Sequence, residues 1–145
     1  MRTHGIQIRQ EYICYGDFRL NSGYESAQML LSKYPRITAL FCANNMMAVG
    51  ALRAIRDAGL SVPDDIAVLS YGSLVPFELY NDSPITAIGQ PAEMMGEECG
   101  MMMLQELNNS VRKRNHPARR VTLETELVLR GSEIFPPHRL KEKEI

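Results

Sequence analysis

The chain has 145 residues, of which 45% are hydrophobic and 23% charged, an ordinary balance for one globular domain or one lobe of a larger one. Lys and Arg number 16 against 17 Asp and Glu, so the net charge of −1 provides no general field to attract a phosphate backbone. The start of the chain lacks the apolar run of a secretory signal, and no stretch is apolar enough to span a bilayer. Composition therefore argues against membrane insertion and against nucleic-acid binding through bulk charge.

The three cysteines are Cys14, Cys42 and Cys99, which lie far apart and form no C-x-x-C pair. Neither a zinc site nor a redox motif is indicated, and we expect no metal or cofactor. Each cysteine has apolar neighbours, which predicts buried, unreactive thiols. Free thiols are typical of a reducing compartment, so we expect a cytoplasmic protein.

The first half of the chain alternates short apolar runs with segments of helical period. Ile13–Tyr15 is interpreted as the end of a short strand. Apolar residues then recur at helical spacing from Tyr24 to Tyr34, and Pro35 ends that helix. Thr38–Cys42 is a continuous apolar run, as expected of a strand covered on both faces.

A second helix follows this strand directly. Asn44 or Asn45 offers an N-cap, and an apolar stripe runs from Ala48 to Ala58. Gly59 then supplies the residue just past the helix end, where a left-handed backbone is common.

The second half repeats the cycle. Ile66–Ser70 predicts another buried strand, followed by a short helix near Pro76–Tyr80 and an extended segment at Thr86–Ile88. A longer helix begins at Pro91, and its methionine-rich apolar face, which runs to Leu107, favours core packing over a docking surface.

The end of the chain is more polar. A basic loop spans residues 108–119, and Val121–Leu129 alternates like a half-buried edge strand. We therefore expect an α/β domain over residues 1–135, a three-layer sandwich around a parallel sheet, and a mobile charged tail at 136–145.

Ligands of open α/β sheets bind beyond the carboxyl ends of the strands. The segments that follow the predicted strands, here named the strand-end loops, are residues 16–18, 43–45 and 71–73. They contain the side chains of Phe18, Asn44, Asn45, Tyr71 and Ser73. Rings and amides suit a neutral polyhydroxylated ligand. A purely structural interpretation stays open, with the asparagines as helix caps and Phe18 in the core.

A search for catalytic motifs gives no candidate. No G-x-S-x-G, H-E-x-x-H, G-x-x-x-x-G-K-[ST] or G-x-G-x-x-G pattern occurs, which argues against an enzyme. Asp64-Asp65 sits between a proline and a strand, where a turn role is favoured over acid–base chemistry. The basic cluster at 112–114 has no interleaved aromatic residue and is interpreted as a solvated loop.

Several motifs in register resemble the LacI/GalR transcription regulators. The main stretch is ITALFCANNMMAVGALRAIRDAGLSVPDDIAVLSYG, where the family has an A-N-D turn, a helix ending in G-L, then V-P-x-D-I and a strand ending in G-F-D-D. Further matches are YGDFRLNSGYESAQMLL, SPITAIGQPAEMMGEECGMMMLQEL and VTLETELVLRGS, so the resemblance covers roughly residues 5–132.

This resemblance implies a type I periplasmic-binding-protein-like sensor with two lobes that close on a small effector. The chain would supply mostly the second lobe and the crossover segments, and the DNA-binding headpiece and most of the first lobe would precede it. The implied effector-binding residues are Phe18, Asn44, Tyr71, Gly72, Ser73 and Gln90. Gly72 replaces the first aspartate of G-F-D-D, which removes a strong acceptor for sugar hydroxyls.

We therefore hypothesise that the chain is the effector-sensing and dimerising part of a regulator. The effector would be a sugar or nucleoside, and operator DNA would be bound only through the headpiece. We expect a homodimer whose interface includes Val49, Leu74, Phe77 and Tyr80. The alternatives are a solute-binding protein of a transport system and a module that senses a protein co-regulator.

Overall fold

The computed structural model describes residues 5, 7–72, 85–111 and 119–134. They belong to two compact units, one made of residues 1–88 with 127–145 and the other of residues 89–126. The elements are the 3-10 helix η2 (Gln10–Tyr12), α1 (Leu20–Lys33), β1 (Ala39–Cys42), α2 (Asn45–Asp57), β2 (Ala67–Tyr71), β3 (Thr86–Gly89), α4 (Ala92–Val111) and β4 (Glu126–Val128). The helix expected near Pro76–Tyr80 and the tail at 136–145 lie outside the described residues.

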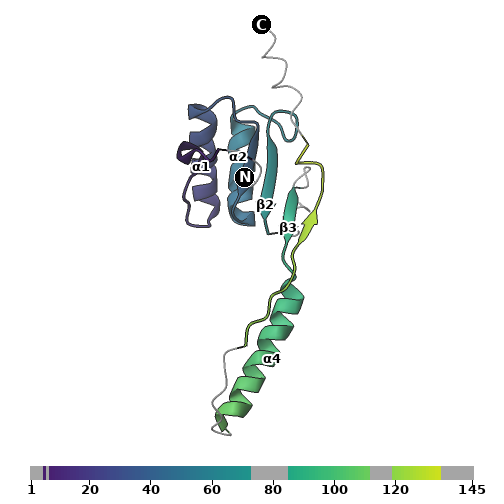
Figure 1. Cartoon of the computed structure of the whole chain (residues 1–145). Helices are drawn as coiled ribbons and strands as arrows, with labels where there is room; N and C mark the ends of the chain where they lie inside the picture. The colour runs from purple at the N-terminus through teal and green to yellow at the C-terminus, as the bar shows by residue number, and fades with distance from the viewer. Residues whose placement is uncertain (1–4, 6, 73–84, 112–118, 135–145) are drawn as a thin grey trace. The chain divides into compact units, whose positions relative to one another are not determined.

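The strands form one sheet in the order β1-β2-β3-β4. β1 and β2 run parallel, with Ala39 opposite Ala67, and β2 and β3 run parallel, with Leu69 opposite Thr86. The predicted parallel α/β architecture is therefore confirmed. α1 and α2 lie side by side against one face of the sheet (Figure 1), and the core of buried side chains lies between them and the strands.

Burial alternates along β1, where Leu40 and Cys42 are buried while Ala39 and Phe41 are exposed. The expectation that this strand is covered on both faces was wrong for the described residues, which cover only the face that α1 and α2 occupy.

Two glycines let α1 and α2 come into backbone contact. A Cβ on Gly23 would lie 2.5 Å from the Met47 Cα, and a Cβ on Gly50 would lie 2.6 Å from the Tyr24 nitrogen. No side chain fits at such distances, so both positions require glycine for this packing. The two helices also share a surface contact, since the Tyr24 hydroxyl donates to Asp57 Oδ2 at 3.1 Å.

Local signals fix both ends of α2 as predicted. The Asn44 side chain accepts a hydrogen bond from the Met47 backbone nitrogen, which makes Asn44 the N-cap. At the other end Gly59 has φ +72°, and its nitrogen donates to Arg56 O while the Leu60 nitrogen donates to Ile55 O. This pair of hydrogen bonds defines a Schellman motif.

Residues 130–133 are joined to the sheet by side-chain hydrogen bonds. The buried Ser132 hydroxyl donates to Val68 O at 2.6 Å and accepts from the Thr86 nitrogen at 2.7 Å. The Thr86 hydroxyl donates to the Glu133 carboxylate, and this bond, above all, lowers the pKa of Glu133. The segment thus satisfies backbone groups that the strands leave unpaired.

Several predicted elements differ from the observed ones. Residues 13–15 form no strand, because they are not part of the four-stranded sheet, in which β1 is an edge strand; a 3-10 turn precedes them, and the Tyr12 ring packs edge-on against Tyr34 at 4.9 Å. The edge strand expected at Val121–Leu129 is limited to β4, and the last helix continues to Val111. Asp65 accepts from the nitrogen and hydroxyl of Ser61, as its predicted turn role requires.

The second unit consists of α4 and the segment that follows it. The Arg119 guanidinium contacts Glu98 Oε2 at 3.2 Å and donates to Gln105, which ties this segment to the helix. Most large apolar side chains of α4 are exposed: Met94, Met95, Met101, Met103, Leu104 and Leu107. The prediction that the methionine-rich face packs into a core was therefore wrong for the described residues.

The three cysteines differ in environment. Cys42 is buried, and desolvation raises the pKa of its thiol to about 12. Cys14 is half-buried, whereas Cys99 is exposed on α4, so the expectation of a buried thiol was wrong there. Within the described ranges, we find no helix long and apolar enough to cross a membrane.

Candidate binding site

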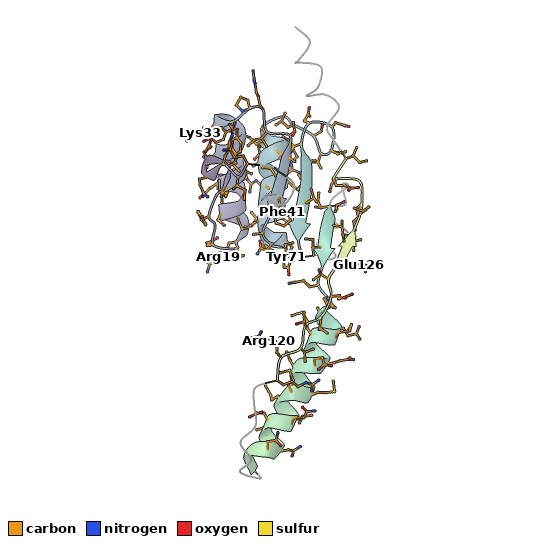
Figure 2. All side chains as sticks on the ribbon, viewed as in Figure 1. Arg19, Lys33, Phe41, Tyr71, Arg120 and Glu126 are labelled. Carbon is orange, nitrogen blue, oxygen red and sulfur yellow. The ribbon has the colours of Figure 1, made fainter. Side chains whose placement is uncertain are left out.

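The described residues of the strand-end loops, 16–18, 43–45 and 71–72, meet at one end of the first unit. Arg19, just before α1, and Tyr71, at the end of β2, lie at the same end of the layered structure (Figure 2). A hydrogen bond joins Asn44 to Phe18, and a Cβ on Gly72 would lie 4.0 Å from the Asn45 nitrogen. Residues far apart in sequence are thus brought together where the sequence analysis expected a ligand.

Phe18 has an unusual backbone and an exposed ring. Its φ is +64°, in the left-handed region, and it is the one non-glycine residue with positive φ in the described part of the chain. A bulky residue in this conformation is a genuine outlier. Its relative exposure is 63%, which contradicts the alternative that Phe18 belongs to the core.

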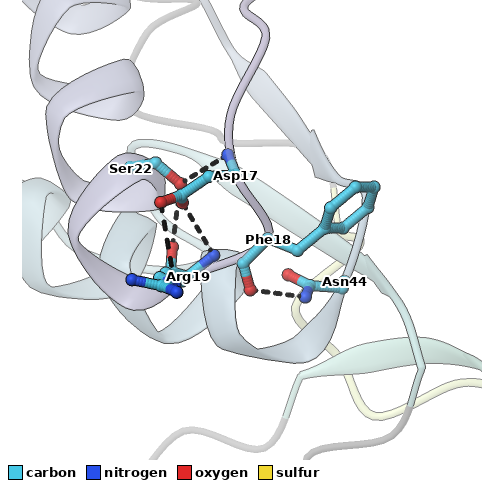
Figure 3. A network of polar contacts seen from close by, with 5 residues as sticks. All are labelled: Asp17, Phe18, Arg19, Ser22 and Asn44. Carbon is cyan, nitrogen blue, oxygen red and sulfur yellow. Dashed lines mark hydrogen bonds and ion pairs between the residues drawn. The ribbon is translucent and has the colours of Figure 1, made fainter.

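Short-range polar contacts fix the backbone on both sides of Phe18 (Figure 3). Asp17 Oδ1 accepts from the Arg19 nitrogen at 3.0 Å, which is an Asx turn across Phe18. The Ser22 hydroxyl accepts from the Asp17 nitrogen and donates to Arg19 O. Hydrogen bonding to Ser22, followed by that from the Arg19 nitrogen, lowers the pKa of Asp17.

Asn44 uses both ends of its side-chain amide. Oδ1 accepts from the Met47 nitrogen at 2.8 Å, and Nδ2 donates to Phe18 O at 2.8 Å. The cap that was predicted as a structural alternative is therefore present, and the same side chain also reaches the loop that carries the aromatic ring (Figure 3).

Tyr71 and Gly72 end β2 beside these loops. The Tyr71 side chain is exposed, and Gly72 has φ +91° and donates from its nitrogen to Ile88 O at 2.9 Å. An L-residue rarely adopts this φ, so the backbone here suits glycine and not the aspartate of the family motif.

Charge contributes little to this edge. Among the described residues 16–19, 43–45 and 71–72, the ionised side chains are Asp17 and Arg19, which approach each other to 3.9 Å. What remains is an exposed phenyl ring, a phenol and amide groups. Such a set can stack on an apolar ring face and exchange neutral hydrogen bonds, but it offers no strong field for an ion.

Two further predicted positions fall within the described residues. Val49 is half-buried on α2 and packs against the core. Gln90 is exposed and belongs to the second unit. Ser73, Leu74, Phe77 and Tyr80 lie outside the described residues.

An apolar cavity of about 470 Å³ lies next to α1 and β1 and reaches the strand-end loops at Ala43. Its lining includes Tyr12, Cys14, Leu30 and Cys42 but none of the predicted site residues. Over the described ranges, His, Cys, Asp and Glu side chains form no group of three that could hold a metal ion.

The roles of Asp17, Arg19 and Ser22 in shaping this edge were not predicted from the sequence. The signal was available in part, because an Asp three residues before a helix can form an Asx turn with the backbone nitrogen two residues later. The long-range contact from Asn44 to Phe18 had no sequence signal.

These features define an α/β domain with exposed aromatic and amide groups at the carboxyl ends of parallel strands. The chain belongs to the periplasmic binding protein-like domain family, whose model matches residues 1–133. Within that family it is similar to LacI-type transcription regulators, so the resemblance seen in the sequence is confirmed.

Three comparisons illustrate the similarity. The chain is 34% identical to the HTH-type transcriptional regulator CelR of Thermobifida fusca over 128 residues, which is 88% of this chain and 36% of CelR. It is 39% identical to the HTH-type transcriptional repressor PurR of Serratia proteamaculans over 107 residues, 74% of this chain and 31% of PurR. A solved complex of the transcriptional regulator CelR with cellobiose superposes with a TM-score of 0.79 at 32% identity, covering 90% of this chain and 38% of that one. The chain thus spans about a third of the length of these relatives.

Proposed function

We propose that this chain is the effector-sensing and dimerising portion of a LacI-type transcription regulator and binds a small polar metabolite of the sugar or nucleoside class. The observation that carries the proposal is the exposed Phe18 ring, which is held in a left-handed backbone beside Asn44 at the carboxyl edge of the sheet. Strained residues held by several side chains cluster at binding sites. A CelR that resembles this chain at 32% identity binds cellobiose, which supports a sugar as ligand.

The residues have distinct proposed roles. The Phe18 ring stacks on the apolar face of the ligand, and Asn44, which is bonded to the Phe18 carbonyl, and the exposed Tyr71 supply polar groups. Gly72 leaves the space next to the start of α2 free of a side chain, so polar recognition relies on neutral groups. By the family resemblance alone we also assign Ser73 and Gln90 to effector binding.

Calorimetry with cellobiose tests this function directly. Phe18→Ala is expected to weaken binding roughly two- to tenfold, because stacking on an aromatic ring contributes about 0.5–1.5 kcal/mol. Phe41→Ala is the matched control, since Phe41 is almost equally exposed, at 60% against 63%, but lies on the open sheet face. Equal losses in both variants, or binding unaffected by Phe18→Ala, would contradict the proposed site.

Association and DNA binding form a further part of the proposal. Exposed apolar side chains on α4 favour pairing of chains, and we assign Val49 with Leu74, Phe77 and Tyr80 to a homodimer interface. Operator DNA would be bound by a headpiece outside these residues, in the cytoplasm. Light scattering tests the dimer, and a stable monomer at high concentration would contradict it.

Other functions have less support. The relatives are transcription regulators, and we propose that this chain too is a sensor and not an enzyme. The similarity to regulators gives no support to a transport protein. A module that senses a protein co-regulator would be favoured only if Phe18→Ala left the binding of sugars and nucleosides unchanged.

A further inference from the structure

The Asn44 side chain is committed to two partners inside the protein. Its carbonyl oxygen accepts from the Met47 nitrogen and its nitrogen donates to Phe18 O, both at 2.8 Å. The first bond alone would make Asn44 an ordinary helix cap, a role that serine fills equally well. The second bond requires a donor at the end of the side chain, which serine is too short to supply across this distance.

That second bond acts on the most strained backbone position of the described residues. Phe18 has φ +64°, a conformation that costs a bulky L-residue enough to depopulate it roughly tenfold without support. Asp17 and Ser22 hold the backbone on the side of α1, and Asn44 holds the Phe18 carbonyl from the side of α2 (Figure 3). Held from both helices, the ring stays exposed instead of folding back against the protein.

We propose that Asn44 is the positioning residue of this site: it fixes the left-handed backbone of Phe18 and influences a bound ligand through the Phe18 ring. The ligand-related part of this inference rests on the proposed function, whereas the positioning part does not. This positioning role differs from direct contact between Asn44 and the ligand. An asparagine nitrogen carries two N–H donors, so a direct bond from the second donor to the ligand is the rival explanation.

A fluorine probe tests positioning without any ligand. 4-Fluorophenylalanine is placed at position 18 of the 145-residue chain, and ¹⁹F NMR spectra are compared for the wild type, Asn44→Ser and Asn44→Ala. Serine keeps the cap to Met47 but loses the donor to Phe18, whereas alanine loses both. Asn21→Ser, which changes an exposed asparagine in the first turn of α1, is the matched control.

The inference predicts a shifted or split fluorine signal in both Asn44 variants and an unchanged signal in Asn21→Ser. Urea unfolding should show loss of stability in Asn44→Ala but little in Asn44→Ser. If the signal of Asn44→Ser equals that of the wild type, or changes only in step with lost stability, Asn44 is merely a cap and the inference is overturned.

A double-mutant cycle with cellobiose then separates indirect from direct action. Asn44→Ser should weaken binding several-fold in the wild type but have no further effect in Phe18→Gly, which lacks the ring. An equal loss in both backgrounds would establish direct contact and overturn the inference. If cellobiose does not bind the wild-type chain at all, the proposed ligand class fails, and the fluorine spectra alone decide the positioning role.

Discussion

Replacement of Gly50 by alanine should destabilise the protein although alanine is the better helix former. A Cβ at this position would meet the backbone of α1 at Leu20 O and at the Tyr24 nitrogen, 2.6 Å away in the second case. Neither group can move without the helix. The gain in helix propensity is about 1 kcal/mol, and overpacking costs typically 1–3 kcal/mol or more. Because the contact is with rigid backbone, we expect an overpacking cost in the upper part of its range. The net effect of Gly50→Ala is then a loss of about 1–2 kcal/mol in the free energy of unfolding.

Urea unfolding followed by far-ultraviolet circular dichroism measures this loss. Gly96→Ala on α4 is the matched control, because a Cβ there would meet nothing within 4 Å. It should be neutral or stabilising by up to about 1 kcal/mol. A Gly50→Ala variant as stable as the wild type would refute the argument that close packing of α1 and α2 depends on glycine.

Three further predictions concern other parts of the first unit and α4. Ser132→Ala should lower the free energy of unfolding in urea by about 2 kcal/mol, because it leaves a buried N–H and a buried carbonyl without their partner. Ser32→Ala on the exposed surface of α1 should be nearly neutral. Similar losses in the two variants would contradict this prediction. In the native protein, the exposed Cys99 should react with a thiol reagent at neutral pH. Cys42 should stay protected until the protein unfolds, since burial raises the pKa of its thiol to about 12. Rapid labelling of Cys42 in the native protein would contradict its burial in the core. Because folding lowers the pKa of Glu133, its ionised carboxylate stabilises the folded protein at pH values above the ordinary pKa of 4.5. This stabilisation is lost as the pH falls through the lower pKa of Glu133 in the folded state. Glu133→Gln should therefore flatten the acid limb of the stability profile, and an unchanged acid limb would argue against the Glu133 hydrogen bonds.

The elements that follow from local sequence signals were predictable. The Asn44 cap and Gly59 delimit α2 in the sequence as they do in the structure, because both signals act within one turn of the helix. The parallel strands β1 and β2 also follow from their apolar runs, which only a covered sheet face can accommodate.

Features that depend on distant contacts could not be predicted. Nothing near Ser132 indicates that its hydroxyl bridges β2 and β3, because its partners are more than 40 residues away along the chain. The left-handed backbone of Phe18 depends in the same way on a hydrogen bond from a residue 26 positions later. The exposure of Cys99 was missed because the methionine-rich period of α4 was interpreted as a core face.

Chemical-shift mapping of a ¹⁵N-labelled chain titrated with cellobiose tests the central claim most directly. If the strand-end loops form the effector site, saturating shifts should gather at the amides of residues 17–19, 44–45 and 71–72, which do not line the cavity. Amides around the apolar cavity, such as those of Tyr12 and Leu30, should change little. Shifts confined to that cavity, or no saturable change at any concentration, would contradict the account.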